Sequence, residues 1–159
     1  MSREYRNAVR VLILDGADRV LLLGARDPDE GIIVWVMPGG GIEDQETTLE
    51  AARRELLEET GLEIIGELQG PIWIRHHKFT WDGQTLSQRE WFVVGRTHRT
   101  DIDVREMGPH EHKYFAGARW FSVDELKAFG EIVAPRRLAE LLPPIIAGDL
   151  PAELLDAGV

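Results

Sequence analysis

Short runs of apolar residues, separated by turn-forming residues, recur along most of the chain and predict β-strands. The expected strands are residues 8–14, 19–23, 32–37, 63–68, 72–81, 85–97 and 118–121. Asp15-Gly16-Ala17-Asp18 and Asp82-Gly83 supply turns between neighbouring strands, and Pro38-Gly39-Gly40-Gly41 ends the third strand.

A helical pattern follows the Pro-Gly-Gly-Gly turn. Thr47 fits the N-cap of a capping box that has Glu50 at its third helical position, and Gly61 fits a left-handed residue at the helix end. The apolar residues of this helix share one face, which is expected to pack against the sheet: Leu49, Ala52 and Leu56.

The last third of the chain predicts two more helices. Ser122 caps a helix that runs to Lys127, and Pro135 suits the first turn of a helix that Pro143-Pro144 ends after Leu142. Residues 101–113 are rich in charge and histidine and are expected to be irregular. Strands flanked by separated helices indicate an α/β or α+β sandwich.

Composition narrows the classes of partner. A length of 159 residues suits a single domain spanning residues 1–159, and 18 basic against 28 acidic residues give a net charge of −10. That charge argues against sequence-independent nucleic-acid binding and against an anionic membrane surface. The chain has no cysteine, and its N-terminal residues 1–7 are too polar for a signal peptide, which favours a cytoplasmic protein.

Three glutamates gather on one face of the first helix. Glu55, Glu58 and Glu59 fall within about 100° of arc at helical spacing. Clustered carboxylates repel one another, and a hard divalent cation such as Mg²⁺ removes that repulsion. The alternative is an ordinary solvated face tied together by Glu50–Arg54 and Arg54–Glu58 pairs.

The glycine turn and the acidic helix together resemble the Nudix box. Gly40, five residues, Glu46, seven residues and then Arg54-Glu55-Leu56-Leu57-Glu58-Glu59-Thr60-Gly61-Leu62 fill every fixed position of that 23-residue pattern. Gln45 stands at a variable position where glycine is frequent. The flanking strands and residues 119–126 extend the resemblance over about 5–142.

The resemblance implies a Nudix-type α/β/α sandwich with a central mixed β-sheet, the box at residues 40–62, and a C-terminal helix and tail at 135–159. It implies a metal-dependent pyrophosphohydrolase acting on a nucleoside diphosphate linked to another group, such as a nucleotide sugar, a dinucleoside polyphosphate or an NTP. It also implies Mg²⁺ or Mn²⁺ as cofactor, with Glu58 and Glu59 as the main metal ligands and the Gly39 carbonyl as a further ligand. In the same pattern Glu55 is a ligand or the base. Arg54 orients the carboxylates, and Glu46 supports the loop. Dimers are frequent in the family, so a homodimer is one expected state.

Other residues add weaker candidates. In several Nudix subgroups a glutamate in the loop at 101–113 completes the metal site or acts as base, which points to Glu111 or Glu106; His110-Glu111-His112 is an incomplete zinc set. Arg26, Arg75 and Arg89 are candidates for binding substrate phosphate or are plain surface residues. The aromatic residues of the central strands suit a core or a base-stacking platform: Trp73, His76, His77, Trp81 and Trp91.

Two rival functions remain. A non-catalytic Nudix-fold sensor would bind a nucleotide or sugar nucleotide to regulate a partner, but such modules often lose the box carboxylates that are present here. An isomerase of isoprenoid diphosphates commonly needs a cysteine, which is absent. The subgroup signatures that mark ADP-ribose, dinucleoside polyphosphate and NADH hydrolases are missing after the box, so the leaving group stays open.

Overall fold

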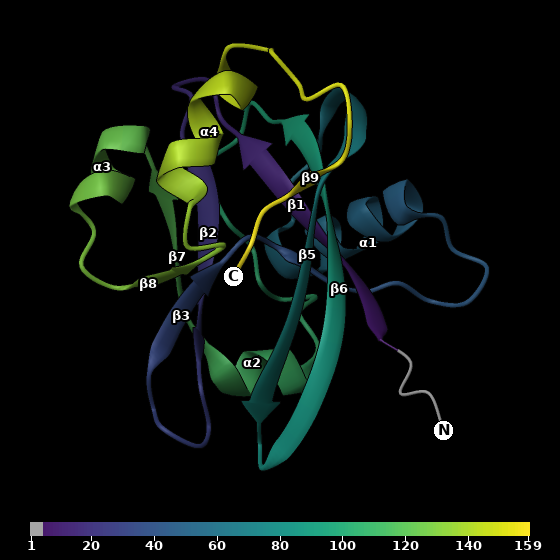
Figure 1. The fold of residues 1–159 in the computed structure, drawn as a ribbon, viewed down its shortest axis with the longest axis vertical. Helices are drawn as coiled ribbons and strands as arrows, with labels where there is room; N and C mark the ends of the chain where they lie inside the picture. The colour runs from purple at the N-terminus through teal and green to yellow at the C-terminus, as the bar shows by residue number, and fades with distance from the viewer. Residues whose placement is uncertain (1–4) are drawn as a thin grey trace.

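The computed structural model describes residues 5–159 (Figure 1). The elements in chain order are β1 (Arg6–Leu14), β2 (Val20–Arg26), β3 (Ile33–Val36), β4 (Gly39–Gly41), α1 (Thr48–Thr60), β5 (Ile65–Trp81), β6 (Gln84–Arg96), α2 (Pro109–Tyr114), β7 (Phe115–Phe121), α3 (Val123–Ala128), β8 (Ile132–Ala134), α4 (Leu138–Ile146) and β9 (Leu155–Asp156). All the strands belong to one sheet.

The sheet is mixed. Its main order is β8-β3-β2-β1-β6-β5-β9, with β4 paired to β1 and β7 paired to β2. β1 runs parallel to β6 and antiparallel to β2, while the β5–β6 hairpin is antiparallel and turns at Asp82-Gly83. Both turn residues have positive φ, 52° and 75°, as the tight hairpin requires.

Two apolar cores lie on opposite faces of the sheet. Alternate residues of β1 point to opposite sides, so Val9 and Val11 join a core with Leu56 of α1, whereas Leu12 joins a core with Leu138 of α4. Figure 1 shows α1 on one side of the strands and α3 with α4 on the other. This arrangement confirms the expected α/β/α sandwich with a mixed sheet.

Two strand predictions need correction. The segments predicted at 63–68 and 72–81 belong to one long strand, β5, which begins at Ile65 and has register shifts against β6 around Gln69. The predicted turn at Gly39–Gly41 is instead the short strand β4, paired with Ala8–Arg10 of β1. Glycine has no side chain to hold the backbone away, so a strand of three glycines lies very close to its neighbours.

The prediction for the last helix is wrong at both ends. α4 begins at Leu138 rather than Pro135, and it continues through Pro143 and Pro144 to Ile146. The two prolines lie on the exposed side, where carbonyls that lose a helical partner can reach water. The opposite side of the helix is buried in the core at Leu138, Leu142 and Ile145, and this packing outweighs the lost backbone hydrogen bonds.

The N-terminal prediction can be followed only in part, because residues 1–4 lie outside the described part of the chain. From residue 5 onward, none of the helices is long and apolar enough to cross a bilayer.

Candidate functional site

Helix α1 is held at both ends as its sequence predicts. The Thr47 side chain accepts a hydrogen bond from the Glu50 N–H, and the Glu50 carboxylate accepts one from the Thr47 N–H. Gly61 ends the helix with φ 69°. Ala52 and Leu56 are buried against the sheet, which sets the rotation of the helix and therefore the direction of its glutamates.

That rotation places two of the three clustered glutamates of α1, Glu55 and Glu59, in the interior. Glu55 and Glu59 are each 7 % exposed, whereas the side chain of Glu58 is 46 % exposed at the rim. A solvated face, the alternative raised by the sequence, is therefore wrong for Glu55 and Glu59. The Glu59 carboxylate accepts a hydrogen bond of 3.2 Å from the Gly39 N–H, which joins α1 to the glycine strand β4.

The glycine strand also contacts Glu55. A Cβ on Gly40 would lie 2.6 Å from Glu55 Oε1 and 2.7 Å from its carboxyl carbon. A Cβ on Gly39 would collide with the backbone carbonyl of Val9. The absence of side chains at these two positions lets the carboxylates of α1 reach the backbone of β4.

Arg54 connects the carboxylates to the loop before the helix. Its guanidinium binds Glu46 at 2.7 and 2.9 Å, Glu55 at 3.0 Å and Glu58 at 3.4 Å, and it donates to the Gly41 carbonyl at 3.0 Å. The hydrogen bond to Arg54 lowers the pKa of Glu46 to about 2 and raises the pKa of Arg54. Arg54 therefore stays charged and fixes the orientation of three glutamates at once.

Burial changes the protonation of the two interior carboxylates. It raises the pKa of Glu59 to about 8 against the opposing charge of Arg10, and it raises the pKa of Glu55 against the opposing contact with Arg54. The neighbouring arginines do not offset the cost of burying these two charged carboxylates. A bound cation would stabilise the charged form of both. The donor set of Glu55, Glu58, Glu59 and the β4 backbone fits a hard divalent ion in this respect.

The side chains do not by themselves form a complete cage. Within residues 5–159, no three His, Cys, Asp or Glu side chains are disposed as a ready metal site. Glu55 and Glu58 are turned onto Arg54, and Glu59 onto the Gly39 N–H.

Glu111 lies on the short helix α2, which corrects the expectation of an irregular segment for residues 109–113, whereas residues 101–108 are irregular as expected. Glu111 and its neighbours His110 and His112 are all exposed. The charge of Glu111 contributes to the raised pKa values of both Glu55 and Glu59, so Glu111 is one of the charges that act on this site. Glu106 is exposed in the preceding segment and is not among the groups that shift these two pKa values.

The three candidate phosphate-binding arginines lie apart from one another. Arg26 is exposed and donates to the Gly31 carbonyl. Arg89 donates to Asn7 at 3.1 Å and lies over the Tyr5 ring. Arg75 is buried and pairs with Glu90, beside His77.

The aromatic residues of the central strands also have different surroundings. Trp73 is in the core against Phe92, whereas His77 stacks on Phe79 with ring centroids 4.8 Å apart and Trp81 packs edge-on against Tyr114 of α2.

Sequence reasoning missed Arg10 and Glu90. Arg10 is in the middle of the apolar strand β1, and its Nε donates to Glu90 Oε2 at 2.7 Å. Burial would raise the pKa of Glu90, but Arg10, His77 and Arg75 together hold that pKa far below its usual range. The available signal was a charged residue at an inward position of a strand that otherwise reads as fully buried, since such a residue needs an opposite charge nearby.

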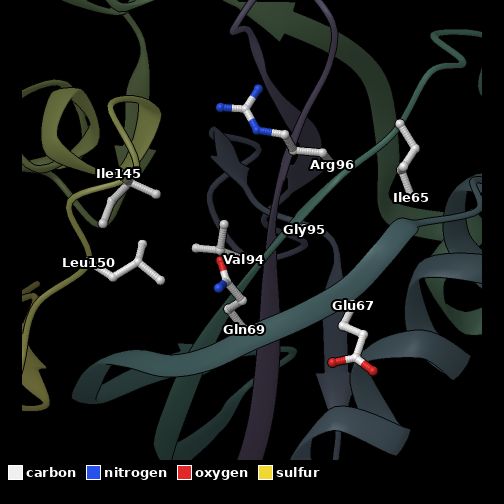
Figure 2. A pocket seen from close by; sticks show the side chains of 9 residues that line it. Ile65, Glu67, Gln69, Val94, Gly95, Arg96, Ile145 and Leu150 are labelled. Atoms are coloured by element: carbon white, nitrogen blue, oxygen red, sulfur yellow. The ribbon is translucent and has the colours of Figure 1, made fainter.

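A pocket of about 280 Å³ lies elsewhere, between β5, β6 and the end of α4 (Figure 2). None of the carboxylates of α1 lines it. Arg96 at its edge is occupied by Asp18 at 2.9 Å and by the Ile146 carbonyl at 3.2 Å. This pocket is separate from the site built on α1 and β4.

Fold and site together define a class, an α+β sandwich with a carboxylate centre between an acidic helix and a glycine strand. The NUDIX domain family model matches residues 4–142. An RNA pyrophosphohydrolase of Helicobacter pylori is 38 % identical over 123 residues, covering 72 % of this chain and 70 % of that protein. One from Dinoroseobacter shibae is 35 % identical over 127 residues, covering 73 % and 76 %. A solved Nudix hydrolase from Nitrosomonas europaea superimposes with a TM-score of 0.63 at 25 % identity, covering 92 % of each chain.

The chain belongs to the Nudix hydrolase family, and its activity is hydrolysis of pyrophosphate bonds.

Proposed function

We propose that this chain is a Mg²⁺- or Mn²⁺-dependent pyrophosphohydrolase of a nucleotide-type substrate. The observation that carries the proposal is the buried pair Glu55 and Glu59, held against the glycine strand with Glu58 at the rim. Nudix hydrolases generally depend on a divalent metal, which when bound neutralises phosphate charge and activates water.

The protein residues would divide the work by position. Glu58 and Glu59 would be the main ligands and the Gly39 carbonyl a further one; the hydrogen bond from the Gly39 N–H to Glu59 supports this by bringing that carboxylate to the backbone of β4. Arg54 would keep Glu55 and Glu58 in orientation through the contacts described above. Glu55 or Glu111 would take the proton from water as its oxygen bonds to phosphorus and the bridging P–O bond breaks.

The relatives add one substrate class to the candidates. The relatives reported above are RNA pyrophosphohydrolases, so the 5′-phosphorylated end of an RNA joins the nucleotide sugars, dinucleoside polyphosphates and NTPs as a candidate. The net charge of −10 disfavours binding along an RNA backbone but leaves recognition of a single 5′ end open. The expectations of a cytoplasmic, membrane-independent protein and of a homodimer stay predictions.

A substrate panel tests the proposal. Purified protein with Mg²⁺ should release phosphate or pyrophosphate from at least one of a nucleotide sugar, a dinucleoside polyphosphate, an NTP, an oxidised NTP and a short 5′-triphosphorylated RNA. Removing divalent ions with EDTA should abolish the release, and added Mn²⁺ should restore it. Inactivity across the whole panel with retained tight nucleotide binding would instead support the sensor.

Metal binding should depend on pH. Because the pKa of Glu59 is raised to about 8, this carboxyl is protonated below that pH and must lose its proton before it binds a cation. The apparent Mn²⁺ affinity should therefore increase by up to about tenfold per pH unit from pH 6 to 8 and then level off. Calorimetry in buffers of different ionisation enthalpy measures both the affinity and the proton release, and a flat profile would contradict the assignment of Glu59 as ligand.

A further inference from the structure

A buried polar cluster joins the neighbouring strands β1, β6 and β5. We call it the Glu90 cluster; its members are Arg10, Arg75, His77, Gln88 and Glu90. Glu90 is at its centre and 2 % exposed. Its Oε2 accepts from Arg10 Nε at 2.7 Å and from Gln88 Nε2 at 3.1 Å, and its Oε1 accepts from Arg75 Nη1. One carboxylate thus binds two guanidiniums.

Arg10 is the member of the cluster that lies next to the glycine strand β4. Its Cα pairs with that of Gly39 across β1 and β4, and the Gly39 N–H binds Glu59. The positive charge of Arg10 acts on both Glu59 and Glu55. Two contacts hold the guanidinium where it is, Nε on Glu90 and Nη1 on the Met37 carbonyl at 3.1 Å.

A guanidinium released beside Glu59 would compete with a metal ion. Arginine binds carboxylates in a bidentate manner and is always charged, so a free Arg10 would form an ion pair with the same oxygens that a divalent cation needs. Arg54 already takes contacts from Glu55 and Glu58, which leaves Glu59 as the box glutamate without an arginine contact among the described hydrogen bonds and ion pairs.

We propose that Glu90 is a positioning residue for metal loading: by binding Arg10 it keeps this guanidinium on the Met37 carbonyl and off Glu59, so that Glu59 is available to the divalent ion. The inference rests on the proposed function, since it takes Glu59 as a metal ligand. It assigns the cluster a role that neither the Nudix box nor the sheet core requires.

The test is Mn²⁺ binding measured by calorimetry on the intact chain, which needs no substrate. Glu90→Gln should weaken binding by about tenfold or more, the usual effect of removing a group that positions a metal ligand. Removing the released charge as well, in Arg10→Met/Glu90→Gln, should return the affinity to within about twofold of wild type. A merely structural role for Glu90 would leave the double variant as weak as the single one.

A matched control is Asp15→Asn. Asp15 is also buried and binds an arginine, Arg19, at 2.7 Å, but it follows β1 at the end five residues away from Arg10. It should lose thermal stability without changing Mn²⁺ affinity. If Glu90→Gln does not fold, Arg10→Met is measured alone and should bind Mn²⁺ at least as tightly as wild type.

The outcomes separate the two proposals. Wild-type affinity in a folded Glu90→Gln variant, failure of the double variant to recover, or tenfold weaker binding in Arg10→Met would each overturn the role of Glu90 while leaving the proposed function intact. Absence of Mn²⁺ binding in the wild-type protein would overturn both.

Discussion

Glu59→Gln is expected to lower kcat/KM by about 10³-fold or more, because a ligand that holds the metal supports several kcal/mol of transition-state stabilisation. The fold should be retained. The amide oxygen can still accept the Gly39 N–H, and burial already disfavours the charged carboxylate, so thermal stability should not fall. Steady-state kinetics on a substrate cleaved in the panel measures kcat/KM of the wild type and of Glu59→Gln, and thermal unfolding compares the stability of the two proteins.

Glu63→Gln is the matched control for this loss. It makes the same substitution at an exposed position two residues beyond the C-cap Gly61, and activity should be unchanged. Wild-type activity in Glu59→Gln would show that the interior carboxylate is structural and that catalysis depends on other groups.

Gly40→Ala is expected to reduce kcat by about 10²-fold, the scale that a displacement of about 1 Å costs in a catalytic arrangement. The new Cβ would be 2.6–2.8 Å from all three atoms of the Glu55 carboxylate group. The Cβ meets the end of the flexible Glu55 side chain and not backbone. The fold should therefore survive, while the Glu55 carboxylate moves out of its contact with Arg54. Measured with saturating Mg²⁺, kcat should therefore fall, whereas the unfolding temperature should stay close to that of the wild type.

Gly16→Ala controls for the general effect of replacing a glycine. A Cβ on Gly16 would have no other atom within 4 Å, and the backbone there does not have a positive φ, so both activity and stability should stay close to wild type. Equal kcat in Gly40→Ala and wild type would mean that Glu55 works from a different position than the one described.

Helix α1 could be predicted because the residues that start, end and orient it are close together in the sequence. The capping box at Thr47, the left-handed Gly61 and the apolar face with Ala52 and Leu56 act within a few residues of one another, and each is confirmed. The spacing of the box glutamates follows directly from the helical period. The Nudix resemblance rests on the same local pattern, whereas the sandwich fold was inferred from predicted strands flanked by separated helices along the whole chain.

The errors arose where distant segments meet. Pro143 and Pro144 end an isolated helix, but the buried face of α4 carries the helix through them. Glu111 could be named as a candidate, yet the helix that presents it depends on packing such as that of Tyr114 against Trp81. Local propensity is outweighed in both places by contacts between elements far apart in sequence.

By itself, the sequence determined the acidic helix and the spacing of its glutamates, because helix periodicity is a property of neighbouring residues. The resemblance to the Nudix box added the class of reaction. Only the tertiary structure decided which glutamates are buried, and it alone paired Arg10 with Glu90, 80 residues away. Burial and long-range ion pairs depend on how the sheet brings β1, β6 and α1 together, and those distances are set by packing rather than by spacing along the chain.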